Sequence, residues 1–206
     1  ELHLKIKRRI KQLRLGKPLD KSTDLGSLVS KTQFNRVSEM VQEGLNHGGE
    51  IYQACDIDEK GNYYPPTLIT DVDSSHPLVQ EEIFGPVLVS MTFRTQSEAV
   101  ELANNSRYGL AASVWSENIN RAMDVAPKVK AGVIWINCHN QFDASCGFGG
   151  VRESGFGREG GKEGLYEYLK PIGLKLPDKT SSISASLKPK DNVIDRTLKF
   201  YIGGKQ

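Results

Sequence analysis

The sequence predicts an α/β fold built around a parallel, doubly wound sheet. Three apolar runs have the length and composition of buried strands, at residues 86–93, 110–116 and 132–137. Two amphipathic segments of helical length, 95–104 and 117–128, separate these runs. Strands and helices that alternate in this way form right-handed β-α-β crossovers, so we expect parallel strands with helices on both faces of the sheet.

The first seventeen residues predict a basic amphipathic helix. Four apolar residues recur along it at helical spacing: Leu2, Ile6, Ile10 and Leu13. Seven Lys or Arg residues against Glu1 give this segment a net charge of +6, and the rest of the chain carries −4, for a total of +2. We interpret the basic side as a solvated surface. A helix that binds RNA or lies on a membrane surface would show the same alternation, but the apolar side here has no Trp or Phe. The mildly acidic remainder argues against a nucleic-acid partner.

Capping signals and composition place the next elements. Ser30 and Gln33 form a capping box that begins a helix ending at Gly48-Gly49. The apolar stripe of this helix consists of Phe34, Val37, Val41 and Leu45. Residues 63–70 predict a short strand, and its two prolines keep its start at an edge of the sheet. A second capping box begins the helix at 95–104.

After residue 137 the periodicity stops and glycine dominates. Residues Gly155 to Gly160 spell the G-x-G-x-x-G of a dinucleotide-binding turn, which requires a strand that leads directly into the first glycine. The nearest predicted strand ends at Asn137, eighteen residues before Gly155. We therefore favour a glycine-rich loop with tight turns and close backbone approach. A pyrophosphate-binding turn stays as the alternative, because a short predicted helix at 162–169 and Asp178 follow as in the fingerprint.

The three cysteines predict neither a disulfide framework nor a catalytic dyad. They are Cys55, Cys138 and Cys146. An odd number without a C-x-x-C pair favours a reducing compartment, so we expect a cytoplasmic protein. Cys138 and His139 are neighbours on an extended segment and point to opposite sides, so we interpret Cys138 as a packed, inert thiol. Cys146 lies in a glycine-rich segment where a thiol can react, but no base is adjacent in the sequence.

Other classes of site find little support in the sequence. The histidines and cysteines lack the spacing of zinc ligands, so we expect no metal site. No run of eighteen apolar residues occurs, and we therefore expect no membrane span. Because the chain begins at Glu1 without Met or a signal segment, we expect it to be cut from a longer protein.

The segment EEIFGPV, residues 81–87, combines two carboxylates, an aromatic residue and Gly-Pro just before a buried strand. Parallel-sheet proteins bind ligands at such an edge. A turn that carries surface acids is the alternative interpretation.

Three segments, taken in their order and spacing, resemble the C-terminal portion of the NAD(P)-dependent aldehyde dehydrogenase superfamily. They are EEIFGPVL, ANNSRYGLAASVWSENINRAMDVAPKVKAGVIWIN and FGGVRESGFGREGGKEGLYEYLKP, and the resemblance extends from residue 1 to about residue 176. It implies that residues 1–153 belong to the catalytic domain and that 154–176 form a return helix and an oligomerisation-type strand at 172–176. Residues 177–195 are polar and predict a linker. Residues 196–206 resemble the start of a second module, so we expect a tandem protein. The resemblance also implies that the full-length protein forms homo-oligomers.

The resemblance also implies roles for individual residues. Glu82 would accept hydrogen bonds from the ribose hydroxyls of NAD or NADP, and Phe84 would pack beside the nicotinamide. Asn137, Phe142 and Phe148 would lie near the tunnel for an aldehyde substrate.

In that family a cysteine forms a thioester with the aldehyde, NAD(P)+ is reduced, and a glutamate-activated water releases the carboxylic acid. The resemblance places the nucleophile, the general base and the dinucleotide-binding domain upstream of Glu1. We therefore expect no catalytic residue in this chain and no activity of the isolated fragment. The alternative is a non-catalytic scaffold of the same family that binds cofactor or partner proteins.

Overall fold

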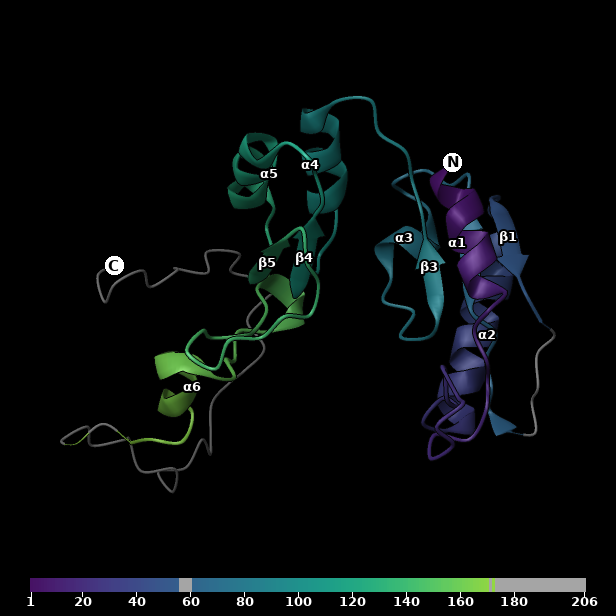
Figure 1. The fold of residues 1–206 in the computed structure, drawn as a ribbon, viewed down its shortest axis with the longest axis horizontal. Coiled ribbons are helices and arrows are strands. Elements are labelled where there is room, and N and C mark those ends of the chain that lie inside the picture. Colours follow the sequence, from purple (N-terminus) through teal and green to yellow (C-terminus); the bar gives the residue numbers. More distant parts are fainter. Residues whose placement is uncertain (56–60, 171, 173–206) are drawn as a thin grey trace, which may run out of the picture. The chain divides into compact units, whose positions relative to one another are not determined.

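The computed structural model describes residues 1–55, 61–170 and 172 (Figure 1). The chain divides into two compact units, Glu1–Tyr168 and Leu169–Gln206, and every helix and strand described below belongs to the first. The predicted strand at 172–176, beyond Ile172, lies outside the described residues. The predicted linker and the predicted start of a second module lie outside them as well.

The first half of the larger unit holds three helices and a three-stranded sheet with the order β1-β2-β3. The elements are α1 (Leu2–Ile10), α2 (Lys31–Leu45), β1 (Glu50–Gln53), β2 (Thr67–Thr70), α3 (Pro77–Gln80) and β3 (Val87–Val89). β2 and β3 are parallel, with Thr67 opposite Val87. β1 is antiparallel to β2, with Glu50 opposite Thr70, so this sheet is mixed. Neither β1 nor α3 was predicted from the sequence, and β3 is shorter than the predicted run.

The core of this half forms along one side of α2. The Ser30 side chain caps the helix by accepting the Gln33 N–H at 3.1 Å, as the sequence predicts. The buried cluster consists of Phe34, Val37, Val41, Tyr64, Ile69, Leu78 and Ile83. The Phe34 and Tyr64 rings meet edge to face with centroids 5.9 Å apart. Through Leu78 of α3 and Ile83 this core reaches the segment that joins α3 to β3.

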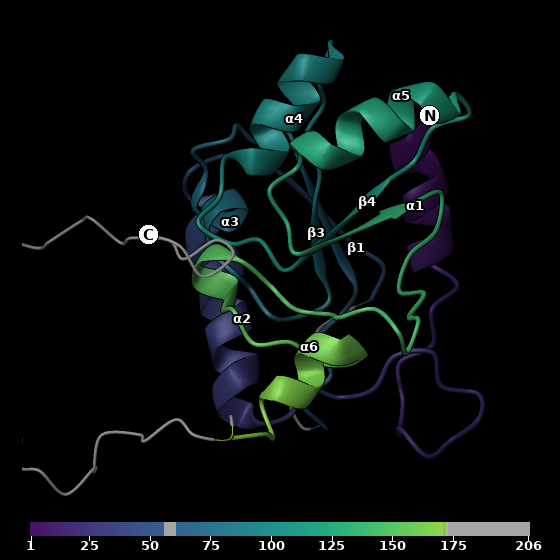
Figure 2. The same cartoon turned by 90° about the vertical axis from the view of Figure 1, so that its left-hand side faces the viewer.

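The second half contains a pair of parallel strands and three helices. The elements are α4 (Gln96–Asn104), β4 (Ala111–Val114), α5 (Ile119–Val125), a 3-10 turn (Ala126–Lys128), β5 (Val133–Ile136), a 3-10 turn (Arg152–Ser154) and α6 (Gly161–Tyr166). β4 pairs with β5 in parallel, as predicted, with Ala111 opposite Val133. Helices α4 and α5 lie beside each other in both views (Figures 1 and 2), and Gln96 donates a hydrogen bond to Asp124 between them. Two sheets, rather than one continuous sheet, are thus seen among the described residues.

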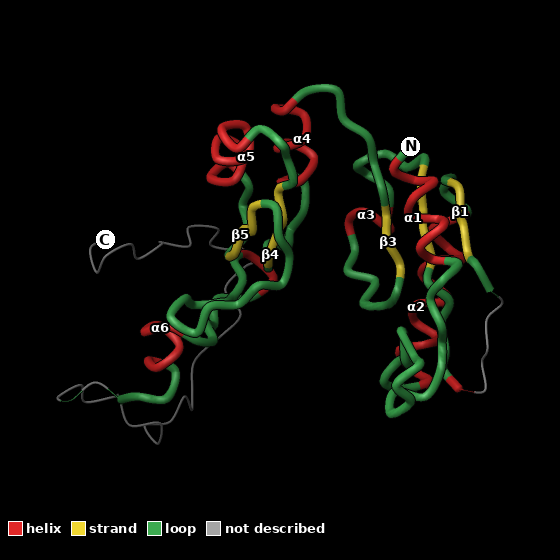
Figure 3. The backbone as a smooth tube through the Cα atoms, viewed as in Figure 1, coloured by secondary structure: helices red, strands yellow, loops and turns green. Residues whose placement is uncertain are grey.

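The glycine-rich stretch between β5 and α6 is irregular, as Figure 3 shows by the long green segment. Among the described residues no strand leads into Gly155, which instead follows a 3-10 turn and has φ +90. An isolated antiparallel bridge joins Phe148 to Glu159. The guanidinium of Arg158 donates to the carbonyls of Gly150 and Gly157 at 2.7 and 2.9 Å and holds the loop closed. The glycines therefore shape a loop, and the pyrophosphate-binding alternative is wrong.

Among the helices that the structure describes, none has the length and apolar character needed to cross a membrane.

The packing of α2 makes a stability prediction. Phe34 is 2% exposed, and Phe34→Ala should lower the free energy of unfolding by about 3–5 kcal/mol because it removes a buried ring and leaves a cavity. Leu19 is 98% exposed, and the control Leu19→Ala should change the free energy by less than about 0.5 kcal/mol. Urea denaturation of the chain measures both values. Similar losses in the two variants would contradict the assigned core.

Candidate functional site

The candidate site is the loop of residues 81–86, which connects α3 to β3 and carries the predicted residues Glu82 and Phe84. Ile83 is buried in the core, whereas its neighbours Glu82 and Phe84 are exposed. Phe84 is 70% exposed and has φ +56, a backbone conformation that costs a bulky residue about 1–3 kcal/mol. Surrounding contacts must therefore hold the loop in this shape.

Two side chains of α2 provide those contacts. The Gln33 amide donates to the carbonyls of Ile83 and Phe84, at 3.4 and 3.0 Å. The Arg36 guanidinium donates to the carbonyls of Ile83 and Glu82, at 3.2 and 3.1 Å. Three consecutive carbonyls are thus fixed from one face of one helix. Gln33 was predicted as the second half of a capping box, but its side chain serves the loop instead.

Gln33 and Arg36 were not predicted as site residues. The only available signal is their spacing of three positions, which places two polar side chains next to each other on a helix.

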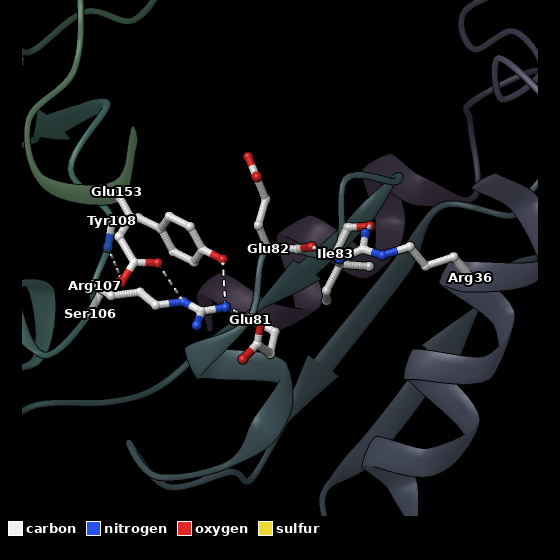
Figure 4. A network of polar contacts seen from close by, with 8 residues as sticks. All are labelled: Arg36, Glu81, Glu82, Ile83, Ser106, Arg107, Tyr108 and Glu153. Atoms are coloured by element: carbon white, nitrogen blue, oxygen red, sulfur yellow. Dashed lines mark hydrogen bonds and ion pairs between the residues drawn. The ribbon is translucent and has the colours of Figure 1, made fainter. Parts of the chain in front are cut away.

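The two glutamates of the loop differ in what they bind. The Glu81 carboxylate forms an ion pair with Arg107, with Nη2 and Oε2 at 2.5 Å. The Glu82 carboxylate extends away from that pair and has no hydrogen-bond or ionic partner among the described residues (Figure 4). An ionised carboxylate with two free oxygens can accept two hydrogen bonds side by side. The site therefore offers one free carboxylate above a backbone that Arg36 fixes.

Arg107 links the loop to two other segments. Its Nη2 donates to the Tyr108 hydroxyl at 2.9 Å, and its Nε lies 3.3 Å from the Glu153 carboxylate. The hydrogen bond to Tyr108 is the largest cause that raises the pKa of Arg107, and the charges of Glu81 and Glu153 also raise it. The residues before β3, before β4 and before Gly155 therefore meet at one guanidinium (Figure 4).

The predicted substrate-side aromatics form a second group. The Phe142 and Phe148 rings meet edge to face at 4.9 Å. Both pack on the indole of Trp135, at 5.7 and 6.3 Å between centroids. Trp135 is buried on β5, and its N–H donates to the carbonyl of Gln141 at 2.8 Å, which holds the start of the loop. Trp135 was not predicted as a site residue, although a Trp in a predicted strand just before the loop was the signal for it.

Asn137 uses its side chain to join two strand ends. Its amide oxygen accepts the Ser116 N–H at 2.8 Å, and its amide nitrogen donates to the Ser116 carbonyl at 2.9 Å. Its φ of +53 turns the chain out of β5. Among the described residues, no hydrogen bond, ion pair or ring contact joins this group of aromatics and Asn137 to Glu82 or Phe84.

The cysteines and histidines form no reactive constellation in the described part of the chain. Cys138 is partly buried, whereas Cys55 and Cys146 are exposed, and all three thiols are free. The ring of His139 lies 3.0 Å from the Ser113 hydroxyl and packs against Trp135. No group of three His, Cys, Asp or Glu residues within the described ranges is arranged to hold a metal ion.

A hollow of about 580 Å³ lies along α4, β4 and α5. Its lining is mainly apolar, with Ala99, Val114 and Val125 among its members, and includes none of the predicted site residues. This hollow and the loop of residues 81–86 therefore share no residue, and the free carboxylate lies on the loop.

Comparisons with known proteins agree on one family. The model described as Aldehyde dehydrogenase family matches residues 1–172. Retinal dehydrogenase 2 of Gallus gallus is 39% identical over 178 residues, which are 84% of this chain and 34% of that protein. Aldehyde dehydrogenase family 2 member C4 of Arabidopsis thaliana is 36% identical over 174 residues, covering 84% and 35%.

Solved structures of the same family match as well. A betaine aldehyde dehydrogenase from Staphylococcus aureus in complex with NAD+ has a TM-score of 0.76 at 39% identity, covering 81% of this chain and 34% of that one. An aldehyde dehydrogenase from Bacillus cereus has a TM-score of 0.77 at 41% identity, with the same coverage. The chain thus spans about a third of the length of these relatives.

The contacts from α2 predict how the loop responds to a substitution. Arg36→Met removes the donors to Glu82 and Ile83, and hydrogen bonds from a charged donor contribute about 1.5–3 kcal/mol. Amide exchange of residues 81–87 should therefore become about 10- to 150-fold faster. The matched control Arg8→Met removes an exposed arginine from α1 and should leave this segment unchanged. Exchange measured by mass spectrometry tests this, and equal rates in both variants would contradict the assigned role of Arg36.

Proposed function

The chain belongs to the aldehyde dehydrogenase family, and we propose that it forms part of the active site of an enzyme that oxidises an aldehyde to a carboxylic acid with NAD+ or NADP+. The observation that carries the proposal is the free Glu82 carboxylate on a loop whose backbone Arg36 and Gln33 hold. The Staphylococcus aureus relative was solved with NAD+, which supports a dinucleotide as the cofactor.

The residues of the loop fit the nicotinamide end of such a cofactor. A ribose presents two adjacent hydroxyl donors, and the two free oxygens of Glu82 are suited to accept both. The exposed ring of Phe84, two residues further along, provides an apolar surface beside them. When bound, NAD(P)+ accepts the two electrons removed from the aldehyde. The role of this chain is to hold that end of the cofactor in one orientation.

We place the aldehyde against the aromatic group of Trp135, Phe142 and Phe148. Phe142 is 60% exposed, so its ring is available to a ligand, whereas buried Trp135 supports it from below. Aromatic walls of this kind exclude water and bind apolar substrates. Asn137 borders this wall, where its amide keeps the ends of β4 and β5 together.

We propose that the thiol that forms the thioester is none of the three cysteines of this chain. His139, the neighbour of Cys138, is engaged by Ser113 and Trp135, and no histidine contact is found for Cys146 among the described residues. The reactive cysteine and the glutamate that activates water then belong to parts of the parent protein outside residues 1–206. The division into catalytic-domain portion, return helix, linker and second module, the cytoplasmic location and the homo-oligomeric assembly stay predictions.

Substitution of the two glutamates tests the cofactor site. In the full-length parent, Glu82→Gln should raise the Kd for NAD+ about 10- to 150-fold, because charge-assisted hydrogen bonds contribute about 1.5–3 kcal/mol. Glu81→Gln is the matched control and should raise it less than about 5-fold, because it removes only an exposed ion pair. Titration calorimetry without aldehyde measures both constants. Equal effects would contradict the assignment of Glu82.

Substitution of the cysteines tests the location of the nucleophile. In the full-length parent, Cys138→Ser and Cys146→Ser should each leave aldehyde-dependent NADH formation within about 2-fold, since these thiols only pack or face solvent. Loss of a true nucleophile lowers kcat by roughly 10⁴-fold or more, and such a loss in either variant would contradict the proposal. A parent that binds NAD+ through Glu82 but oxidises no aldehyde would instead be a scaffold of this family.

A further inference from the structure

We propose that Arg107 is a positioning residue that holds Glu81 in an ion pair, so that Glu82 alone presents a carboxylate to the nicotinamide ribose. The inference rests on the proposed function of Glu82. In this way the chain distinguishes between two adjacent acids that are chemically almost the same.

The loop needs the ion pair with Arg107 because α2 fixes the backbone of the loop but not the side chain of its first residue, Glu81. Gln33 and Arg36 hold the carbonyls of residues 82–84, and neither contacts the Glu81 carboxylate. Without Arg107, Glu81 would be a second uncompensated negative charge on the residue next to Glu82, on a side chain free to turn toward it. Exposed charges act on each other over the Debye length, roughly 8 Å at physiological ionic strength. Glu81 would then repel the Glu82 carboxylate and compete with it for the same hydroxyl donors.

Arg107 is built to hold Glu81 in one place. Its guanidinium is itself held from two other sides, by the Tyr108 hydroxyl at 2.9 Å and by Glu153 at 3.3 Å. The guanidinium carbon also lies 5.1 Å from the centre of the Tyr108 ring. A planar guanidinium with several fixed donors can satisfy these partners together, whereas the point charge of a lysine cannot.

The backbone beneath Arg107 is anchored to the same region. The Glu153 N–H donates to the Arg107 carbonyl at 3.1 Å. The side chain of Gln80, the residue just before Glu81, donates to the carbonyl of Asn105 at 2.9 Å. The start of the loop is therefore joined to the segment of Arg107 twice, through the Gln80 side chain to the carbonyl of Asn105 and through the ion pair of Glu81 with Arg107.

Because both side chains are exposed, the ion pair orients the Glu81 carboxylate and adds little to the stability of the fold. The side chains of Arg107 and Glu81 are 46% and 43% exposed, and ion pairs at such sites contribute little to the free energy of unfolding. The effect of removing Arg107 should therefore be seen in cofactor binding, with the unfolding transition nearly unchanged.

A double-substitution experiment on the full-length parent tests this role through the Kd for NAD+, measured by titration calorimetry in the absence of aldehyde. Arg107→Gln should raise the Kd by about 3- to 10-fold, because it frees Glu81 beside Glu82. Adding Glu81→Gln to Arg107→Gln should return the Kd to within about 2-fold of Glu81→Gln alone, because the competing charge is gone. Arg107→Lys, which keeps the charge, should recover part of the loss. The control Arg8→Gln removes an exposed arginine of α1 and should have no effect.

Two results would overturn the role of Arg107 while leaving the proposed function intact. One is an unchanged Kd in Arg107→Gln while Glu82→Gln still weakens binding. The other is a double variant that binds as weakly as Arg107→Gln, because the arginine would then act through Glu153 and the packing of its own segment. If Arg107→Gln does not fold, Arg107→Lys replaces it, both alone and combined with Glu81→Gln. The same two results would then overturn the role of Arg107. A parent whose NAD+ affinity is insensitive to Glu82→Gln overturns the proposed function and this inference together.

Discussion

The candidate site depends on the hydrogen bonds that α2 donates to the loop between α3 and β3. Gln33 and Arg36 donate hydrogen bonds to three consecutive carbonyls of that loop, and Ile83 of the loop is buried in the core that packs along α2. These hydrogen bonds stabilise the positive φ of Phe84, because a loop without them would relax to a less strained conformation. Because the backbone is held in this way, the exposed side chains of Glu82 and Phe84 start from a fixed position.

The same principle links the fold to the chemistry at a larger scale. The apolar residues of α2 form part of the core. Gln33 and Arg36, which lie beside them on the same helix, donate hydrogen bonds to the loop. Gly85 completes this fit, because a methyl group there would come within 3.0 Å of both γ carbons of Val37. The helix that stabilises the sheet is thus also the helix that sets the geometry of the site, and damage to its packing should reach Glu82 as well.

Local patterns in the sequence predicted the elements whose apolar residues repeat, such as α2, α4, β4 and β5. They missed β1 and α3, which are four residues long and too short to show a period. Chemistry pointed to EEIFGPV, but neither spacing nor composition could reveal that Arg107 would meet Glu81 from 26 positions away or that Trp135 would support Phe142. Such contacts are set by tertiary packing. Gln33 illustrates this, because its backbone N–H is capped by Ser30 as predicted, whereas its side chain binds the carbonyl of Phe84, which the local sequence does not reveal.

The most direct test of this account is a crystal structure of the full-length parent protein with NAD+ bound. The account predicts both Glu82 oxygens within about 2.5–3.2 Å of the two hydroxyls of the nicotinamide ribose, with Glu81 still paired to Arg107. A ribose bound by Glu81, or a cofactor bound away from residues 81–86, would contradict it.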